Sequence, residues 1–330
     1  MTVRSGWYGL AMAMAIVSSP LLAAEDLALP GNVQTFDDGR MPVEQLYQHY
    51  LLLREHGWQL DVITQSQPAG REYALPIIAL RTPHDGNAVW IMSGIHGEET
   101  AGPNAIAESI AELVELAKHQ AVVLLPLNNP HGYANNWRYL NTPAYSAEIE
   151  GQSVGDSSWL LLDPEQAAAA RAATASSPEA EAITRYVVKT ARAYFPILSL
   201  DLHEDNLIDE GYVYSQGKLG DQDPLAALAV RVLKANGIAL KMAGVTRFDE
   251  PISEGIIGPV VDGSIDELMS AASIMLDGEI QPGPFADTVL VFETPAAALA
   301  LPQRVQAHAA VIKQLGEEVV AQAEATMGSE

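Results

Sequence analysis

The chain has 330 residues, no cysteine, and 42 acidic against 18 basic side chains, which gives a formal net charge of −24. So strong a negative charge excludes nucleic-acid binding through a general phosphate field. We interpret the charge as a contribution to solubility; the alternative is that it attracts cationic substrates. The lack of cysteine excludes thiol catalysis, Cys-ligated metal and disulfides, so the fold must be stabilised by its own core.

Residues 1–24 have the pattern of a secretory signal peptide. Arg4 near the start is followed by an apolar run and by small residues up to Ala24, and the segment contains no acidic residue. A membrane anchor is the alternative, but Pro20 interrupts an apolar run that is far shorter than the ~20 residues a span needs. We therefore expect a periplasmic or secreted protein without a membrane span, whose catalytic domain covers residues 25–330.

Strand-length apolar runs alternate with helix-length amphipathic segments along the chain. In chain order we expect a helix at 43–57, strands at 60–64, 73–80 and 88–93, a helix from about 99, a strand at 121–127, a helix at 177–194, a strand at 197–202, a helix at 223–235, a strand at 288–292 and a helix from 302. The irregular segment 141–177 is expected to be a surface excursion with a short helix near Asp163. This alternation predicts a single α/β domain whose sheet is covered on both faces.

The segment 93–100 brings two candidate metal ligands together. It follows an apolar strand and leads into a helix, so His96 and Glu99 stand three residues apart on the turn between them. A neutral imidazole and a carboxylate are natural zinc ligands. Gly94 and Gly97 would let the backbone turn tightly around them.

The strand at 197–202 leads into a third candidate ligand. His203 ends this strand, and Asp201, two residues earlier, projects to the same face, where its carboxylate could orient the histidine ring. The strand at 288–292 leads into Glu293, a carboxylate that is costly at the end of an apolar strand unless it has a partner or a task.

All these polar groups stand at the carboxyl ends of strands, where open α/β sheets bind ligands. We therefore expect His96, Glu99 and His203 to bind one zinc ion, with a fourth position open for water that Glu293 could deprotonate. A single histidine is more often a surface or core residue than a ligand, and five are interpreted in that way: His49, His56, His84, His119 and His308.

Together the motifs resemble the zinc carboxypeptidase family, of which carboxypeptidase A is the best-known member. They are His96-Gly97-Glu98-Glu99, Asn129-Pro130-His131-Gly132, the distant His203 and Phe292-Glu293-Thr294-Pro295, and the resemblance runs from about residue 40 to 320. It implies a mixed, mostly parallel twisted sheet with helices on both faces, and zinc bound by the three residues named above.

The resemblance also implies roles for further residues. Glu293 matches the general base and proton shuttle, and Arg138 matches an arginine that polarises the scissile carbonyl, where fixed positive charge has a large effect. A surface ion pair is the alternative for Arg138. Outside the resemblance, Arg247 or Lys241 is a candidate for a contact with a substrate carboxylate, and Asn141 is a further candidate for substrate binding.

The sequence departs from the family where a substrate carboxylate is gripped. The family usually has an asparagine and an arginine there, but the corresponding segment carries Ser158 and Trp159, although Asp156 keeps its place beside the metal ligands. The tyrosine that many members have shortly before the catalytic glutamate is also missing, since Tyr212 and Tyr214 follow closely after the ligating histidine. The sequence therefore lacks the residues with which the family recognises a free C-terminus.

We expect a zinc-dependent hydrolase that cleaves an amide bond in a peptide or peptide-like substrate. One alternative is an N-acyl amino acid deacylase, because the stretches Ile95–Gly102 and Asp201–His203 are similar to succinylglutamate desuccinylase and aspartoacylase. The other is a non-catalytic zinc-binding relic of the fold, although Glu293 and Arg138 are not needed merely to bind zinc.

Overall fold

The computed structural model describes residues 27, 29, 33–68, 70–140 and 156–327. The predicted signal peptide, residues 1–24, lies outside the described residues, so it stays a prediction. Within the described part of the chain, no helix is both long and apolar enough to cross a membrane.

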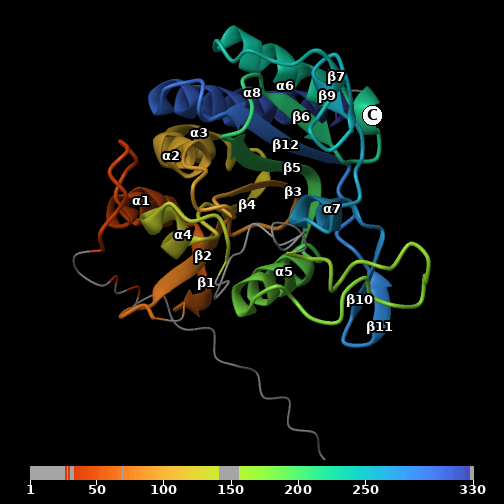
Figure 1. The fold of residues 1–330 in the computed structure, drawn as a ribbon, viewed down its shortest axis with the longest axis horizontal. Helices are drawn as coiled ribbons and strands as arrows, with labels where there is room; N and C mark the ends of the chain where they lie inside the picture. The colour runs from red at the N-terminus through yellow and green to blue at the C-terminus, as the bar shows by residue number, and fades with distance from the viewer. Residues whose placement is uncertain (1–26, 28, 30–32, 69, 141–155, 328–330) are drawn as a thin grey trace, which may run out of the picture.

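A ten-stranded sheet forms the middle of the molecule (Figure 1). Its order is β1-β2-β4-β3-β5-β12-β6-β9-β8-β7, and a separate hairpin pairs β10 with β11. The strands are β1 (Gln59–Ser66), β2 (Leu75–Arg81), β3 (Gly86–Ser93), β4 (Ala121–Leu125), β5 (Tyr194–Asp205), β6 (Tyr212–Ser215), β7 (Ala243–Val245), β8 (Pro251–Ser253), β9 (Ile256–Ile257), β10 (Ser273–Leu276), β11 (Glu279–Pro282) and β12 (Thr288–Pro295). The sheet is mixed, and its centre, β4-β3-β5-β12, is parallel. The predicted fold class is thus confirmed.

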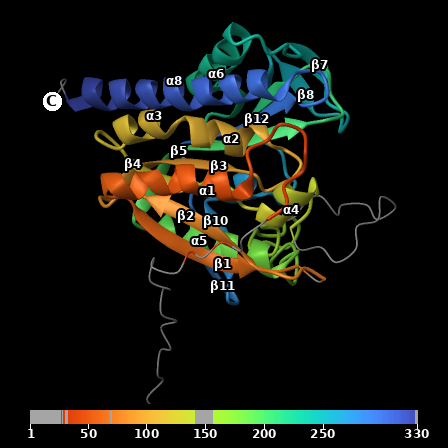
Figure 2. The same cartoon turned by 90° about the vertical axis from the view of Figure 1, so that its left-hand side faces the viewer.

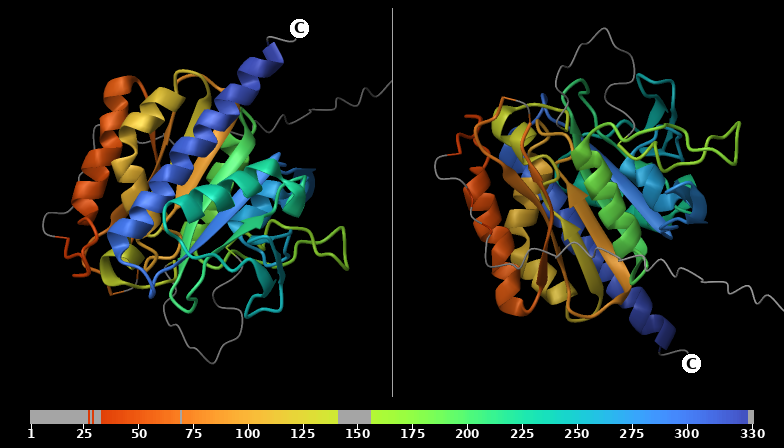
Figure 3. Two further views of the ribbon diagram at one scale, coloured as in Figure 1. Left: turned by 90° about the horizontal axis from the view of Figure 1, so that it is seen from above. Right: turned by 90° about the horizontal axis from the view of Figure 1, so that it is seen from below.

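Helices cover both faces of this sheet. One face carries α1 (Val43–Leu51), α2 (Ala101–Glu108), α3 (Ile110–Leu116), α4 (Pro130–Asn135), α6 (Pro224–Ala235) and α8 (Leu301–Met327), and the other carries α5 (Pro178–Thr190) and α7 (Ile265–Ser270) (Figure 3). Two short 3-10 helices lie at Leu52–His56 and Gly220–Gln222. The long helix α8 runs beside α2 and α6 (Figure 2).

Alternation along the buried strands creates a separate core on each face. In β2, Ile78 and Leu80 pack with the α1 side, whereas Ile77 and Ala79 pack with the α5 side. All four side chains are fully buried. Because successive side chains point to opposite faces, a strand covered on both sides appears in sequence as a continuous apolar run.

Some predicted elements differ in extent. The helix expected at 43–57 ends as an α-helix at Leu51 and continues in 3-10 form, and the helix expected to reach 194 ends at Thr190 because β5 already begins at Tyr194. The helix predicted near Asp163 is wrong. There the Asp163 carboxylate accepts backbone hydrogen bonds from Glu165 and Gln166 (2.8 and 3.1 Å) and stabilises a turn, a local contact that competes with helix formation.

Candidate metal centre and active site

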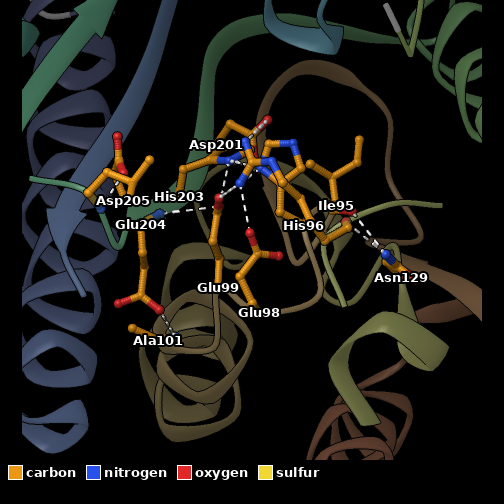
Figure 4. Close-up of polar contacts among 12 residues, drawn as sticks. Ile95, His96, Glu98, Glu99, Ala101, Asn129, Asp201, His203, Glu204 and Asp205 are labelled. Atoms are coloured by element: carbon orange, nitrogen blue, oxygen red, sulfur yellow. Dashed lines mark hydrogen bonds and ion pairs between the residues drawn. The ribbon is translucent and has the colours of Figure 1, made fainter. Parts of the chain in front are cut away.

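Three neighbouring parallel strands bring the candidate ligands and Glu293 to one edge of the sheet. His96 and Glu99 follow β3, while His203 lies near the end of β5. Glu293 lies in β12, directly opposite His203 in the strand register. Because the strands are parallel, their carboxyl ends meet, and residues far apart in sequence become neighbours (Figure 4).

The three candidate ligands converge on one point. Nδ1 of His96 lies 2.8 Å from Oε1 of Glu99, Nδ1 of His203 lies 2.8 Å from Oε2 of the same carboxylate, and the two Nδ1 atoms are 3.1 Å apart. One ligand atom from each residue fits within 4.8 Å of the others, and this is the one such cluster of three or more potential ligands among the described residues.

Charge at the cluster favours a cation. Burial would raise the pKa of Glu99, but His96, His203 and Arg138 hold it well below its usual range. Burial would lower the pKa of His203, but Asp201 and Glu99 raise it well above its usual value. A divalent cation between these groups would benefit from the same negative charge that favours a proton on His203.

The predicted orienting carboxylate lies behind His203. Oδ2 of Asp201 is 3.1 Å from Nε2 of His203, on the side of the ring opposite the nitrogen that faces Glu99. Asp156 lines the cavity beside the same histidines, and burial raises its pKa although His96 and His203 oppose that change. The structure therefore brings both predicted carboxylates to the cluster.

Arg138 takes part in ion pairs inside the cavity. Its NH1 lies 2.9 Å from Oε1 of Glu98 and 2.7 Å from Oε1 of Glu99. These two carboxylates raise its pKa although burial opposes the change. Arg138 thus lies at the cluster, in an ion pair with a candidate ligand, and its side chain is 30% exposed.

The Asn129-Pro130-His131-Gly132 motif supports the ligand loop from behind. Asn129 begins α4 by accepting a hydrogen bond from Gly132 N (2.9 Å), and its Nδ2 donates to the Arg138 carbonyl (3.1 Å). A Cβ on Gly97 would come within 2.1 Å of Gly132 backbone. Gly97 lies in a turn, as predicted, which the Glu99 N–H closes on the His96 carbonyl (3.2 Å), but it is the close approach of two backbones that requires a glycine there. Gly94 adopts a left-handed φ of 62°.

Glu293 faces the same cavity without joining the ligand cluster. Burial, with the nearby Glu99 carboxylate, raises its pKa to about 8, against the opposing effect of His203. Its Oε2 is buried without a hydrogen-bond partner among the described residues. Buried polar atoms nearly always have a hydrogen-bond partner, so an unpartnered one in a residue of the cavity wall is a candidate contact for a bound ligand.

The cavity has a volume of about 530 Å³. Of the predicted substrate-binding residues, Arg247 lines it and forms an ion pair with Asp205, while Asn141 lies outside the described residues. Trp159 is not among the lining residues, and Arg185 stacks over its ring 4.9 Å from the centroid. Ser158 does not line the cavity either.

The sequence interpretation missed other residues of the cavity wall. Asp205 ends the strand that carries His203, so its position at the strand end could have identified it. Gln216 and Asp266 are hydrogen-bonded to each other (2.9 Å) although they lie 50 residues apart, and no local sequence pattern predicts that either lines the cavity. By contrast, the five histidines expected elsewhere lie outside the cavity.

The donor set fits a divalent metal. Two imidazole nitrogens and a carboxylate are the ligands that catalytic zinc sites use, and they lie within reach of one ion. The buried Oε2 of Glu293 has no hydrogen-bond partner among the described residues, and a ligand bound at the metal would provide one.

The family model of the succinylglutamate desuccinylase/aspartoacylase catalytic domain matches residues 85–148. This segment contains His96, Glu99 and Arg138. Among curated proteins, none matches the sequence.

Solved structures share the fold. A candidate metallopeptidase from Shewanella amazonensis superposes with a TM-score of 0.65 at 21% identity, covering 84% of this chain and 92% of its own. Carboxypeptidase A from Helicoverpa armigera gives 0.54 at 16% identity, with 89% and 75% covered. Bovine thrombin-activatable fibrinolysis inhibitor, solved with a tick carboxypeptidase inhibitor, gives 0.56 at 13% identity, with 86% and 99% covered. The two resemblances expected from the sequence are confirmed: the desuccinylase/aspartoacylase model matches part of the chain, and the fold is shared with carboxypeptidases.

Proposed function

We propose that this protein is a zinc-dependent hydrolase that cleaves an amide bond in a peptide or peptide-like substrate. The observation that carries the proposal is the convergence of His96, Glu99 and His203 at a cavity that Glu293 and Arg138 also line. Zinc held by the three residues would act as a Lewis acid toward the substrate carbonyl and make water a better nucleophile.

The protein groups divide the remaining work. Glu293 takes the proton from the attacking water and passes it to the leaving nitrogen, a role that its place in the cavity wall beside the ligand cluster allows. Arg138 donates to the oxygen on which negative charge develops. Asp201 holds the ring of His203 in orientation through its Nε2, and Asp156 adds negative charge beside both imidazoles.

Arg247 is our candidate for the contact with a substrate carboxylate. It is the arginine, besides Arg138, among the described residues that line the cavity, and its guanidinium stacks over Phe248 with 4.7 Å to the ring centroid. Its partner Asp205 fixes it there. Such an arginine would compensate for the gripping pair that Ser158 and Trp159 replace.

Deacylation of N-acyl amino acids is the second candidate. The match of residues 85–148 to the desuccinylase/aspartoacylase catalytic domain favours it. Both reactions hydrolyse an amide next to a carboxylate, so the same groups serve either substrate.

The decisive experiment is an activity screen of the metal-loaded protein. Dipeptides, longer peptides and N-acyl amino acids are assayed with and without a chelator, and bound metal is measured in the same samples. We expect chelator-sensitive, zinc-restored hydrolysis of one of these classes. Bound zinc without hydrolysis of any would favour the non-catalytic relic, and absence of bound metal would refute the site.

A further inference from the structure

A buried ion pair lies directly behind the proposed metal site. Glu204 follows His203 in β5, and because strand residues alternate, its side chain points to the opposite face, toward α2 and α8. Its side chain is completely buried, and the partner guanidinium, Arg304 of α8, is only 10% exposed. The reaction proposed above assigns no role to either residue.

Glu204 ties the ligand Glu99 to β5. The main-chain N–H of Glu204 donates to Oε2 of Glu99 (3.2 Å), and the Glu204 carboxylate accepts from the N–H of Ala101 (2.7 Å), the first residue of α2 (Figure 4). Thr100 precedes this helix without a capping hydrogen bond from its side chain. Glu204 therefore accepts a hydrogen bond from a backbone N–H at the start of α2, where the Thr100 side chain provides no cap. It also places negative charge where the helix dipole favours it.

The same carboxylate reaches the strand of Glu293. Its Oε1 accepts from Arg304 and from the hydroxyl of Thr294 (3.4 Å), the residue after Glu293. That hydroxyl also lies 3.1 Å from Nε2 of His308 in α8. The buried side chain of Glu204 is thus hydrogen-bonded to Ala101, close after Glu99, and to Thr294, the residue after Glu293. Glu204 itself directly follows His203 in β5.

We propose that Glu204 and Arg304 are positioning residues of the metal site. Arg304 neutralises Glu204, and Glu204 then fixes the loop of Glu99, the end of β5 and the end of β12 in one arrangement. This inference rests on the function proposed above, because it assumes that metal binds at His96, Glu99 and His203. Groups that orient metal ligands typically change metal affinity 10- to 100-fold when they are removed.

The test compares Arg304→Met with a matched control, Arg81→Met. Arg81 also pairs with a buried carboxylate, Asp61 (2.7 Å), but in β1 and β2, at the far edge of the sheet. Each full-length protein is titrated with Zn²⁺ against a chromophoric chelator, the absorption spectrum of its Co²⁺-loaded form is recorded, and its thermal unfolding is followed.

We expect Arg304→Met to bind Zn²⁺ at least ~10-fold more weakly than the wild type and to show an altered Co²⁺ spectrum. Arg81→Met should lower the melting temperature while both metal readouts stay as in the wild type. If Arg304→Met does not fold, Arg304→Lys and Arg81→Lys replace the two variants, with weaker Zn²⁺ binding expected only in the first.

Three outcomes would overturn the inference. Unchanged metal readouts in the Arg304 variant would make the ion pair purely structural and leave the proposed function intact. An equal loss in the Arg81 variant would attribute the effect to general destabilisation. No Zn²⁺ binding by the wild-type protein would overturn both this inference and the proposed function.

Discussion

Replacing Glu293 with glutamine separates a general base from a metal ligand. Glu293→Gln keeps the size of the side chain and its capacity for hydrogen bonds but removes the group that accepts a proton. In the structure this carboxylate lies in the cavity wall, outside the cluster of His96, Glu99 and His203. The substitution should therefore affect turnover and leave the metal in place.

The expected magnitude follows from that position. Loss of a positioned general base lowers turnover by about 10²- to 10⁴-fold, which corresponds to about 2.7–5.4 kcal/mol in the activation free energy. Since Glu293 contributes no ligand atom, zinc affinity should change by less than about threefold, well below the 10- to 100-fold effect of a group that orients a ligand.

The assay measures kcat on the substrate class found in the screen, together with bound zinc, for wild type, Glu293→Gln and Asp262→Asn. Asp262 is an exposed carboxylate at the same cavity and serves as the control for a lost negative charge. Loss of zinc together with activity would make Glu293 a ligand and refute the reasoning. Unchanged activity would also refute it and would place the base elsewhere, with Glu98 the next candidate in the cavity wall.

Three further predictions address the metal, the substrate and the core. His96→Ala should abolish tight zinc binding in equilibrium dialysis, whereas His84→Ala, at an exposed histidine, should not. Arg247→Met should raise KM for substrates with a free carboxylate by at least ~10-fold, the value of a charged hydrogen bond, with little effect on their amides, and equal KM values for both would exclude this contact. Burial lowers the pKa of His308 to about 3, so below its unfolded value of 6.5 the unfolded state binds a proton that the folded state does not. Lowering the pH from neutral to 5 should therefore reduce the free energy of unfolding by about 2 kcal/mol, at about 1.4 kcal/mol per pH unit below 6.5. In urea unfolding, His308→Gln should lose much of this pH dependence.

The sequence by itself determined the fold class and the three candidate metal ligands, because both depend on local pattern. Strands buried on two faces are continuous apolar runs, as in Ala121–Leu125, and every one of these residues is buried. Ligands at the ends of such strands meet because parallel strands share one edge, so the proximity of His96 and His203 could be predicted without coordinates.

Only the tertiary structure decided which long-range partners complete the site. Glu204 and Arg304 are 100 residues apart, and their pairing depends on how α8 crosses the sheet beside α2. Gln216 and Asp266 meet in the cavity wall in the same way. The close contact of Gly97 with the Gly132 backbone, which requires a glycine, could not be predicted from the turn in which Gly97 lies. Periodicity specifies which side of an element is buried, but the partner on the other side is set by the packing of whole elements, and no local sequence pattern encodes that arrangement.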